Sequence, residues 1–337
     1  MNILHILSEI EKVDPEVYER LDSRRAIFKH MTGMGKTLAA AAVPMAFGAV
    51  FNKAYAQTSM APSVLDVLNF ALKLEYLESV FYNTGLGTAG AAATAVQTAL
   101  RAGLSTNNVT ALEKIRTDEA NHVTFLRSAI TAAGGTPIAA PDANEFDFTG
   151  GKGSNTGPLA TVFTSPATFL AVAQALEDTG VRAYKGGAPF LASNKDVLTA
   201  ALNIHSVEAR HASRLRTMRR AAPTEMRPSG TAAGSNLSNT PKSWVSGTDT
   251  GGPAPAVTAP VYGAGEQPSY LPASTGITFP AEDNVSQGGI TLNTQLPSLT
   301  SLNIPAAAFS EAFDEPLSVP TVLTIARTFA RTGSTFF

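Results

Sequence analysis

Two copies of the pattern Glu-x-x-His carry the clearest chemical potential in this chain: Glu119-Ala-Asn-His122 and Glu208-Ala-Arg-His211. A spacing of three residues brings the two side chains of each pair onto one face of a helix. Carboxylate and imidazole suit iron, manganese and zinc as ligands. The chain has no Cys, which excludes thiolate metal sites, disulfides and Cys nucleophiles. The pattern therefore predicts a metal site built from carboxylates and imidazoles.

Both pairs interrupt a stripe of apolar residues at helical spacing. The two stripes, in order, are Leu112, Ile115, Glu119, His122, Leu126, Ile130 and Ala201, Ile204, Glu208, His211, Leu215, Met218. The Glu and His side chains are therefore expected in the core. An unpaired carboxylate is costly to desolvate. A pair of divalent cations would remove that cost.

Two further carboxylates complete a repeat. Glu75 follows Leu74 and stands seven residues before Tyr82, and Glu177 follows Leu176 and stands seven before Tyr184. Seven residues are close to two helical turns, so each Tyr is expected on the same side of the helix as its own Glu. In each half of the chain a Glu-x-x-His pair follows on the next helix. The repeat predicts six ligands: Glu75, Glu119, His122, Glu177, Glu208 and His211.

Several neighbouring residues have two interpretations. Glu78 also lies close to the inward stripe of its helix, but Gly180 occupies the corresponding place in the other half, which favours Glu75 as the ligand. His205 is expected to support the site or the core rather than to bind metal. Tyr82 and Tyr184 either hydrogen-bond ligand carboxylates or relay electrons, or they pack at helix ends.

Asp118 and Asp178 each adjoin an expected ligand. They would either accept hydrogen bonds beside the site or lie on solvated helix faces.

Caps and breakers predict the helices that carry these residues. They are expected over residues 63–82, 91–102, 108–133, 165–185 and 194–220. Asn83 and Gly85 are expected to end the first helix, and Gly186 with Gly187 the helix over residues 165–185. A connection rich in Gly, Pro and Asn, residues 131–164, divides the bundle. A long connection between the second and third bundle helices lets those two run parallel, which predicts an all-α four-helix bundle with one long crossover.

These residues resemble the metal site of the ferritin-like superfamily: Glu75, Glu119-Ala-Asn-His122, Glu177 and Glu208-Ala-Arg-His211. The phrases LKLEYLESVFY, TDEANHVTFL, ALEDTGVRAY and VEARHASRLR resemble more closely the exported ferritin-like branch that includes plant desiccation-related proteins. The resemblance implies a ferritin-like four-helix bundle that binds two iron or manganese ions, with Glu119 and Glu208 bridging them. Zinc also suits the ligand types, but it would be redox-silent.

The resemblance leaves the reaction open. Relatives in the superfamily act as ferroxidases, oxidases, peroxidases or manganese catalases, so the substrate would be dioxygen, peroxide or ferrous iron. The alternative is a structural or envelope-associated stress protein in which the metals only stabilise the bundle. The long tail argues against a closed storage shell. No catalytic residue beyond the metal ligands and no organic cofactor is expected.

The chain divides into three parts. Residues 1–56 are expected to be a twin-arginine-type export signal: Arg24-Arg25 is followed by an apolar stretch and by Ala54-Tyr55-Ala56, which fits signal peptidase. The apolar stretch, residues 37–51, is shorter than the about 20 residues of a membrane helix. Residues 57–221 form the bundle, and residues 222–337 a Pro/Gly/Ser/Thr-rich extension. This organisation predicts a periplasmic or cell-envelope protein with no stable membrane span after signal removal.

Composition limits the partners. In 337 residues, 44% are hydrophobic and 15% charged, which predicts a buried core, and the formal net charge of -2 shows no electrostatic footprint for nucleic acid. A homo-oligomer is compatible with this sequence. In the extension, a short helix is expected over residues 320–331. With residues 309–317 before it, it should pack back on the bundle; the alternative for residues 223–286 is disorder.

Overall fold

The computed structural model describes residues 62–221, 242–247, 255–271, 275–295, 304 and 306–337. The expected export signal, residues 1–56, lies outside the described residues. So does much of the segment that joins the bundle to the extension. No helix in the described ranges combines the length and the apolar character needed to cross a membrane.

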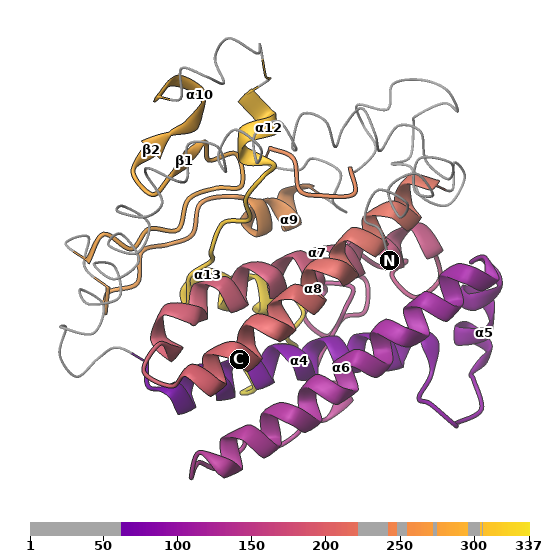
Figure 1. Ribbon diagram of the computed structural model, residues 1–337. Helices are drawn as coiled ribbons and strands as arrows, with labels where there is room; N and C mark the ends of the chain where they lie inside the picture. The colour runs from indigo at the N-terminus through magenta and orange to yellow at the C-terminus, as the bar shows by residue number, and fades with distance from the viewer. Residues whose placement is uncertain (1–61, 222–241, 248–254, 272–274, 296–303, 305) are drawn as a thin grey trace, which may run out of the picture.

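Four long helices form two antiparallel hairpins (Figure 1). One hairpin consists of α4 (Val64–Leu86) and α6 (Thr106–Ala132), with the short α5 (Ala95–Ala102) between them. The other consists of α7 (Pro166–Gly187) and α8 (Lys195–Ala221), joined by the 3-10 turn η2 (Ala188–Leu191). Helices pack much more closely within each hairpin than between the hairpins.

The expected apolar stripes of the second and fourth bundle helices are confirmed. The buried residues of α6 are the six of the predicted stripe, with Glu119 and His122 at its centre. The six predicted positions on α8 are buried as well. Periodicity alone therefore located the core face of both helices, polar residues included.

Three helix bounds differ from the prediction. Helix α5 begins at Ala95, after its cap Thr94, rather than at residue 91. Helix α4 continues through Asn83 and Gly85; Gly85 lies against the ring of Phe169, where a Cβ would come within 2.4 Å of a ring carbon. The helix ends at Gly87, whose φ of 88° favours glycine. Helix α7 includes Gly186, where a Cβ would stand 2.0 Å from the Leu317 carbonyl oxygen. Both glycines serve close packing inside a helix rather than termination.

The long crossover connects parallel helices, as expected. In Figure 1, α6 and α7 run in the same direction, and residues 133–165 return the chain between them. This segment contains the 3-10 turn η1 (Ala143–Glu145) and is tied to the C-terminal residues, because Phe146 forms an isolated antiparallel bridge with Ala330. The crossover is therefore packed structure rather than a free loop.

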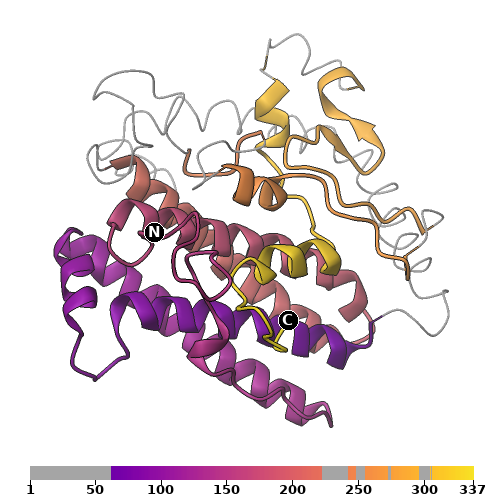
Figure 2. The ribbon, with the colours of Figure 1, turned by 180° about the vertical axis from the view of Figure 1, so that it is seen from behind.

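The extension lies over one side of the bundle. It contains α9 (Pro255–Tyr262), a small hairpin of β1 (Ser286–Gln287) and β2 (Ile290–Thr291), α10 (Leu292–Gln295), α12 (Ala306–Ser310) and α13 (Val319–Arg327). Figure 2 shows α13 lying across the bundle, where it packs on α7 and α9. Helix α13 begins after Ser318 and ends at Arg327, four residues before the expected end. Apolar residues of α13 and α9 join the main core, including Val322, Ile325 and Val261.

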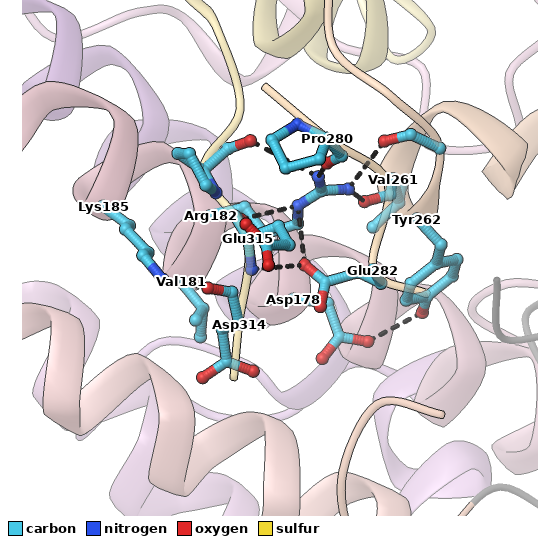
Figure 3. Close-up of polar contacts among 12 residues, drawn as sticks. Asp178, Val181, Arg182, Lys185, Val261, Tyr262, Pro280, Glu282, Asp314 and Glu315 are labelled. Carbon is cyan, nitrogen blue, oxygen red and sulfur yellow. Dashed lines mark hydrogen bonds and ion pairs between the residues drawn. The ribbon is translucent and has the colours of Figure 1, made fainter. Parts of the chain in front are cut away.

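One buried arginine joins the extension to the bundle (Figure 3). Arg182 on α7 is only 2% exposed. Its Nε lies 2.8 Å from Glu282 Oε1, and its guanidinium donates to the carbonyl oxygens of Val261, Gly263, Pro280, Glu315 and Pro316. A guanidinium has five N–H donors in a fixed plane. Arg182 thus gathers three separate stretches of the extension around one point of α7.

We predict that Arg182→Met lowers the free energy of unfolding by about 3–5 kcal/mol, because it leaves Glu282 and several carbonyl groups buried without their donor. Chemical denaturation would measure the loss, and limited proteolysis should cut the extension faster. Arg210→Met on α8, an exposed position, is the matched control and should change stability by less than about 0.5 kcal/mol. Equal stabilities for the two variants would contradict the role of Arg182.

Candidate metal centre

The structure brings all six predicted residues together between the two hairpins. Two groups of four side chains offer ligand atoms that lie within 4.8 Å of one another. One group is Glu75, Glu119, His122 and Glu208, and the other is Glu119, Glu177, Glu208 and His211. Glu119 and Glu208 belong to both groups. Each group therefore contains one Glu and one His of its own and shares two carboxylates with the other.

Each imidazole faces the carboxylates with its Nδ1 atom. His122 Nδ1 lies 3.1 Å from Glu75 Oε2, 3.1 Å from Glu119 Oε2 and 3.3 Å from Glu208 Oε1. His211 Nδ1 lies 2.9 Å from Glu119 Oε1 and 3.1 Å from Glu177 Oε2. The four Glu side chains are completely buried. The cluster is thus a dry concentration of acidic oxygens with an imidazole nitrogen at each end.

The two shared carboxylates are short of donors. Within the described chain, Glu119 Oε1 and both carboxylate oxygens of Glu208 accept no hydrogen bond, although each Glu has an imidazole nitrogen nearby. Buried polar atoms normally have a hydrogen-bond partner, and those that do not are expected to contact an ion or a water molecule. Hard, oxygen-rich surroundings with two imidazoles fit iron, manganese or zinc. The donor set therefore fits a pair of divalent cations.

Burial and charge shift the acid–base behaviour of the cluster. Burial raises the pKa of Glu75 to about 7, and burial together with the other carboxylates raises the pKa of Glu208 well above its usual value. Burial would also raise the pKa of Glu119, but the nearby nitrogens of both imidazoles outweigh it and lower that pKa to about 2. Burial would lower the pKa of each His, but the carboxylates raise both far above 6.5. Without cations, the cluster must draw protons to balance its negative charge.

Two tyrosines connect the halves of the cluster. Tyr82 on α4 donates to Glu177 Oε1 on α7 at 2.5 Å, and Tyr184 on α7 donates to Glu75 Oε1 on α4 at 2.5 Å. Each Tyr is buried like the Glu of its own helix, but its hydroxyl reaches the carboxylate of the other hairpin. Of the two interpretations, the hydrogen bond to a ligand carboxylate is the one observed. Glu75 and Glu177 each belong to only one of the two groups of ligand atoms. Each Tyr binds one carboxylate oxygen of one of these residues and leaves the second oxygen for a cation.

Glu78 on α4 and Gly180 on α7 occupy equivalent places. The first adds a buried carboxylate, and the second has no side chain. Glu78 is buried but is absent from both groups of ligand atoms, which agrees with the choice of Glu75. Burial, followed by repulsion from Glu208, raises the pKa of Glu78 well above its usual value. At Gly180 a Cβ would stand 2.7 Å from Glu208 Oε2. The glycine therefore leaves room for the shared carboxylate of α8.

His205 lies outside the cluster, and Asp118 lies at its edge. His205 Nδ1 lies 2.9 Å from the Val181 carbonyl oxygen and takes no part in the cluster, as expected. Asp118 Oδ2 lies 3.2 Å from His211 Nε2, so it contacts the back of one ligand ring. Such a contact fixes the ring so that Nδ1 faces the cluster.

Asp178 fits neither of its two interpretations. It is buried on the outer face of α7, where it accepts hydrogen bonds from Arg216 and from the hydroxyl of Tyr262 at 2.7 Å. It therefore belongs with Arg182 to the contact between α7 and the extension (Figure 3). Sequence reasoning also missed Arg182. The available signal was a polar row at a spacing of four, Gln174, Asp178 and Arg182, next to the face that carries Glu177.

Comparison with known families agrees with this geometry. Residues 63–221 match the model of the ferritin-like domain family. This part of the chain is therefore a ferritin-like domain, an all-α four-helix bundle with a buried carboxylate and histidine cluster compatible with a metal site. No curated protein and no solved structure matches the chain significantly. The resemblance to the exported, desiccation-related branch stays a prediction.

We predict that Tyr82→Phe and Tyr184→Phe each lower the free energy of unfolding by about 1–3 kcal/mol, because a buried ligand carboxylate loses its donor. Chemical denaturation in the presence of chelator would measure the loss without any contribution from bound metal. Tyr76→Phe is a matched control on α4, since its hydroxyl accepts from Arg127 outside the cluster. A smaller loss for both site variants than for Tyr76→Phe would show that these bonds carry little energy.

Proposed function

We propose that this protein is an exported ferritin-like protein that binds a dinuclear iron or manganese centre and uses it for redox chemistry on dioxygen, peroxide or ferrous iron. The observation that carries the proposal is the sharing of Glu119 and Glu208 by the two groups of ligand atoms. Two ions that share two carboxylates lie close enough to act together on one small oxidant. Oxidative or desiccation stress is the setting that the resemblance implies.

Charge balance supports two ions rather than one. Four buried carboxylates carry four negative charges when ionised, and two divalent cations would offset them while both imidazoles stay neutral. Glu75 with His122, and Glu177 with His211, would each hold one ion, and Glu119 and Glu208 would bridge. Such metals supply one-electron steps toward dioxygen or peroxide when bound.

The chain's own residues would prepare the centre for that chemistry. Tyr184 and Tyr82 orient the terminal carboxylates through one oxygen each. Gly180 gives the Glu208 carboxylate space to change its orientation. Asp118 contacts Nε2 of His211, the ring nitrogen that faces away from the cluster. Burial of the whole cluster excludes bulk water.

A structural role of the metals is the second candidate. Complete burial of the four carboxylates favours it, since a closed site with no open coordination position does no chemistry. In that case the ions would join the two hairpins and stabilise the fold in an envelope-associated stress protein. Hydrogen peroxide turnover and ferrous-iron oxidation by the loaded protein distinguish the two roles. Metal binding without either activity would favour the structural one.

We predict two metal ions per chain in protein loaded with iron or manganese, measured by elemental analysis. His122→Ala or His211→Ala should remove one ion first, because each His belongs to one group only. Glu119→Gln or Glu208→Gln should reduce both. Bound metal stabilises the folded state by about 2.7 kcal/mol at a hundredfold excess over the dissociation constant, so chelator should lower the melting temperature.

Glu113→Gln is the control for these substitutions, because Glu113 lies on α6 but pairs with Arg101 outside the cluster. It should keep both ions. A wild-type protein that binds none of iron, manganese or zinc after refolding, and melts identically with chelator, would overturn the metal proposal. Loss of both ions in Glu113→Gln would show that the substitutions act through general unfolding.

Export is proposed on the sequence of residues 1–56 alone. We predict that protein recovered from the cell envelope begins at Gln57, after Ala54-Tyr55-Ala56, and that the double substitution Arg24→Lys with Arg25→Lys retains it in the cytoplasm. Cell fractionation and intact mass spectrometry would test both points. A mature cytoplasmic pool that still carries residues 1–56 would contradict export.

A further inference from the structure

A large cavity lies between the two hairpins at the end of the bundle where α7 meets η2. Its volume is about 620 Å³, within the roughly 300–1,000 Å³ that ligand pockets span. Its walls come from α4, α6, α7, η2, α8 and α13, together with Leu317 and Tyr270 of the extension. Segments far apart in sequence therefore converge on it, as they do at a built pocket.

The lining of this cavity is strongly apolar. Phe70 and Leu74 of α4, Leu126 of α6, Phe190 of η2 and Val322 of α13 are representative. Transfer of apolar surface from water to such a cavity is favourable by roughly 25 cal/mol per Å². Water would find few polar partners there, and an apolar cavity takes up apolar molecules. The cavity therefore suits a ligand with an apolar body.

Charge selects the head group of that ligand. The described lining contains Asp66 and Asp196 but no Lys, Arg or His. An anionic head group would meet like charges without a compensating cation. A neutral head, such as an alcohol or a carbonyl, avoids this repulsion.

The cavity also touches the candidate metal centre through one side chain. Tyr184 lines the cavity, and its hydroxyl donates to Glu75 Oε1 in the cluster. We propose that this cavity binds a neutral, mainly apolar small molecule, such as a medium-chain alcohol, with its body against the ring of Tyr184. The site goes beyond the redox function proposed above and does not depend on bound metal.

Fluorescence titration of the full chain with Nile red, a neutral apolar dye, tests the proposal. The titration is run with chelator present, so that its result is separate from that of the metal experiments. We expect saturable binding of one dye per chain and displacement by decanol at an at least about tenfold lower concentration than by decanoate, which differs in its charged head group. Absence of saturable binding would overturn the site. Equal displacement by the two competitors would overturn the assigned ligand class.

Substitutions that fill the cavity locate the binding. Ala200→Phe on α8 places a ring into the cavity, and Ala129→Leu on α6 fills part of it with less risk to the fold. Both should weaken dye binding at least about tenfold, as expected when the occupied volume is lost. Ala99→Phe on α5, an exposed position outside the lining, is the control and should bind as wild type. Unchanged binding in folded Ala200→Phe and Ala129→Leu would place the dye elsewhere and overturn the proposal.

Discussion

The burial of four carboxylates in the centre of a helical bundle is the constraint on which the rest of this structure depends. Each carboxylate is inaccessible to solvent. Even if both were protonated, the two imidazoles would carry only two positive charges against four negative ones. Uncompensated charge in a core costs several kcal/mol per group, so such a cluster persists only with protons or cations. The surroundings are arranged around this need. Two hydroxyls point at the terminal carboxylates, and a glycine makes room for a shared one.

The same cluster couples the two hairpins to each other. Direct packing between them is sparse, and a large apolar cavity separates them at one end. Near the middle, however, Tyr82 and Tyr184 cross from one hairpin to the carboxylate of the other. Neither half can therefore complete its ligand set alone. A cation bound there would contact side chains of both hairpins, so its binding would favour their association.

Periodicity predicted the bundle and all six clustered residues because both depend on local spacing. Helical stripes put Glu119, His122, Glu208 and His211 on core faces, and the internal repeat then identified the two remaining carboxylates. The direction of the tyrosine contacts depends on how one helix is rotated against another, which spacing within a helix does not encode. The docking of the extension was harder still, because Arg182 binds backbone carbonyl groups, and these have no signature in sequence. The polar row that contains Arg182 on α7 is unusual in the sequence, but it does not indicate which partner it binds.

The internal repeat holds for the ligands but not for what surrounds them. Asp118 precedes Glu119 and contacts His211, whereas Val207 precedes Glu208 and offers His122 no such acceptor. On α4, Glu78 adds a further buried carboxylate, whereas the equivalent position on α7 is Gly180. Carboxylates that contact a ligand from behind, or add charge nearby, change how strongly that ligand binds a cation. The two halves of the cluster thus share one set of ligand types in two different electrostatic environments. Two cations bound there would be inequivalent, because the side chains around their ligands differ.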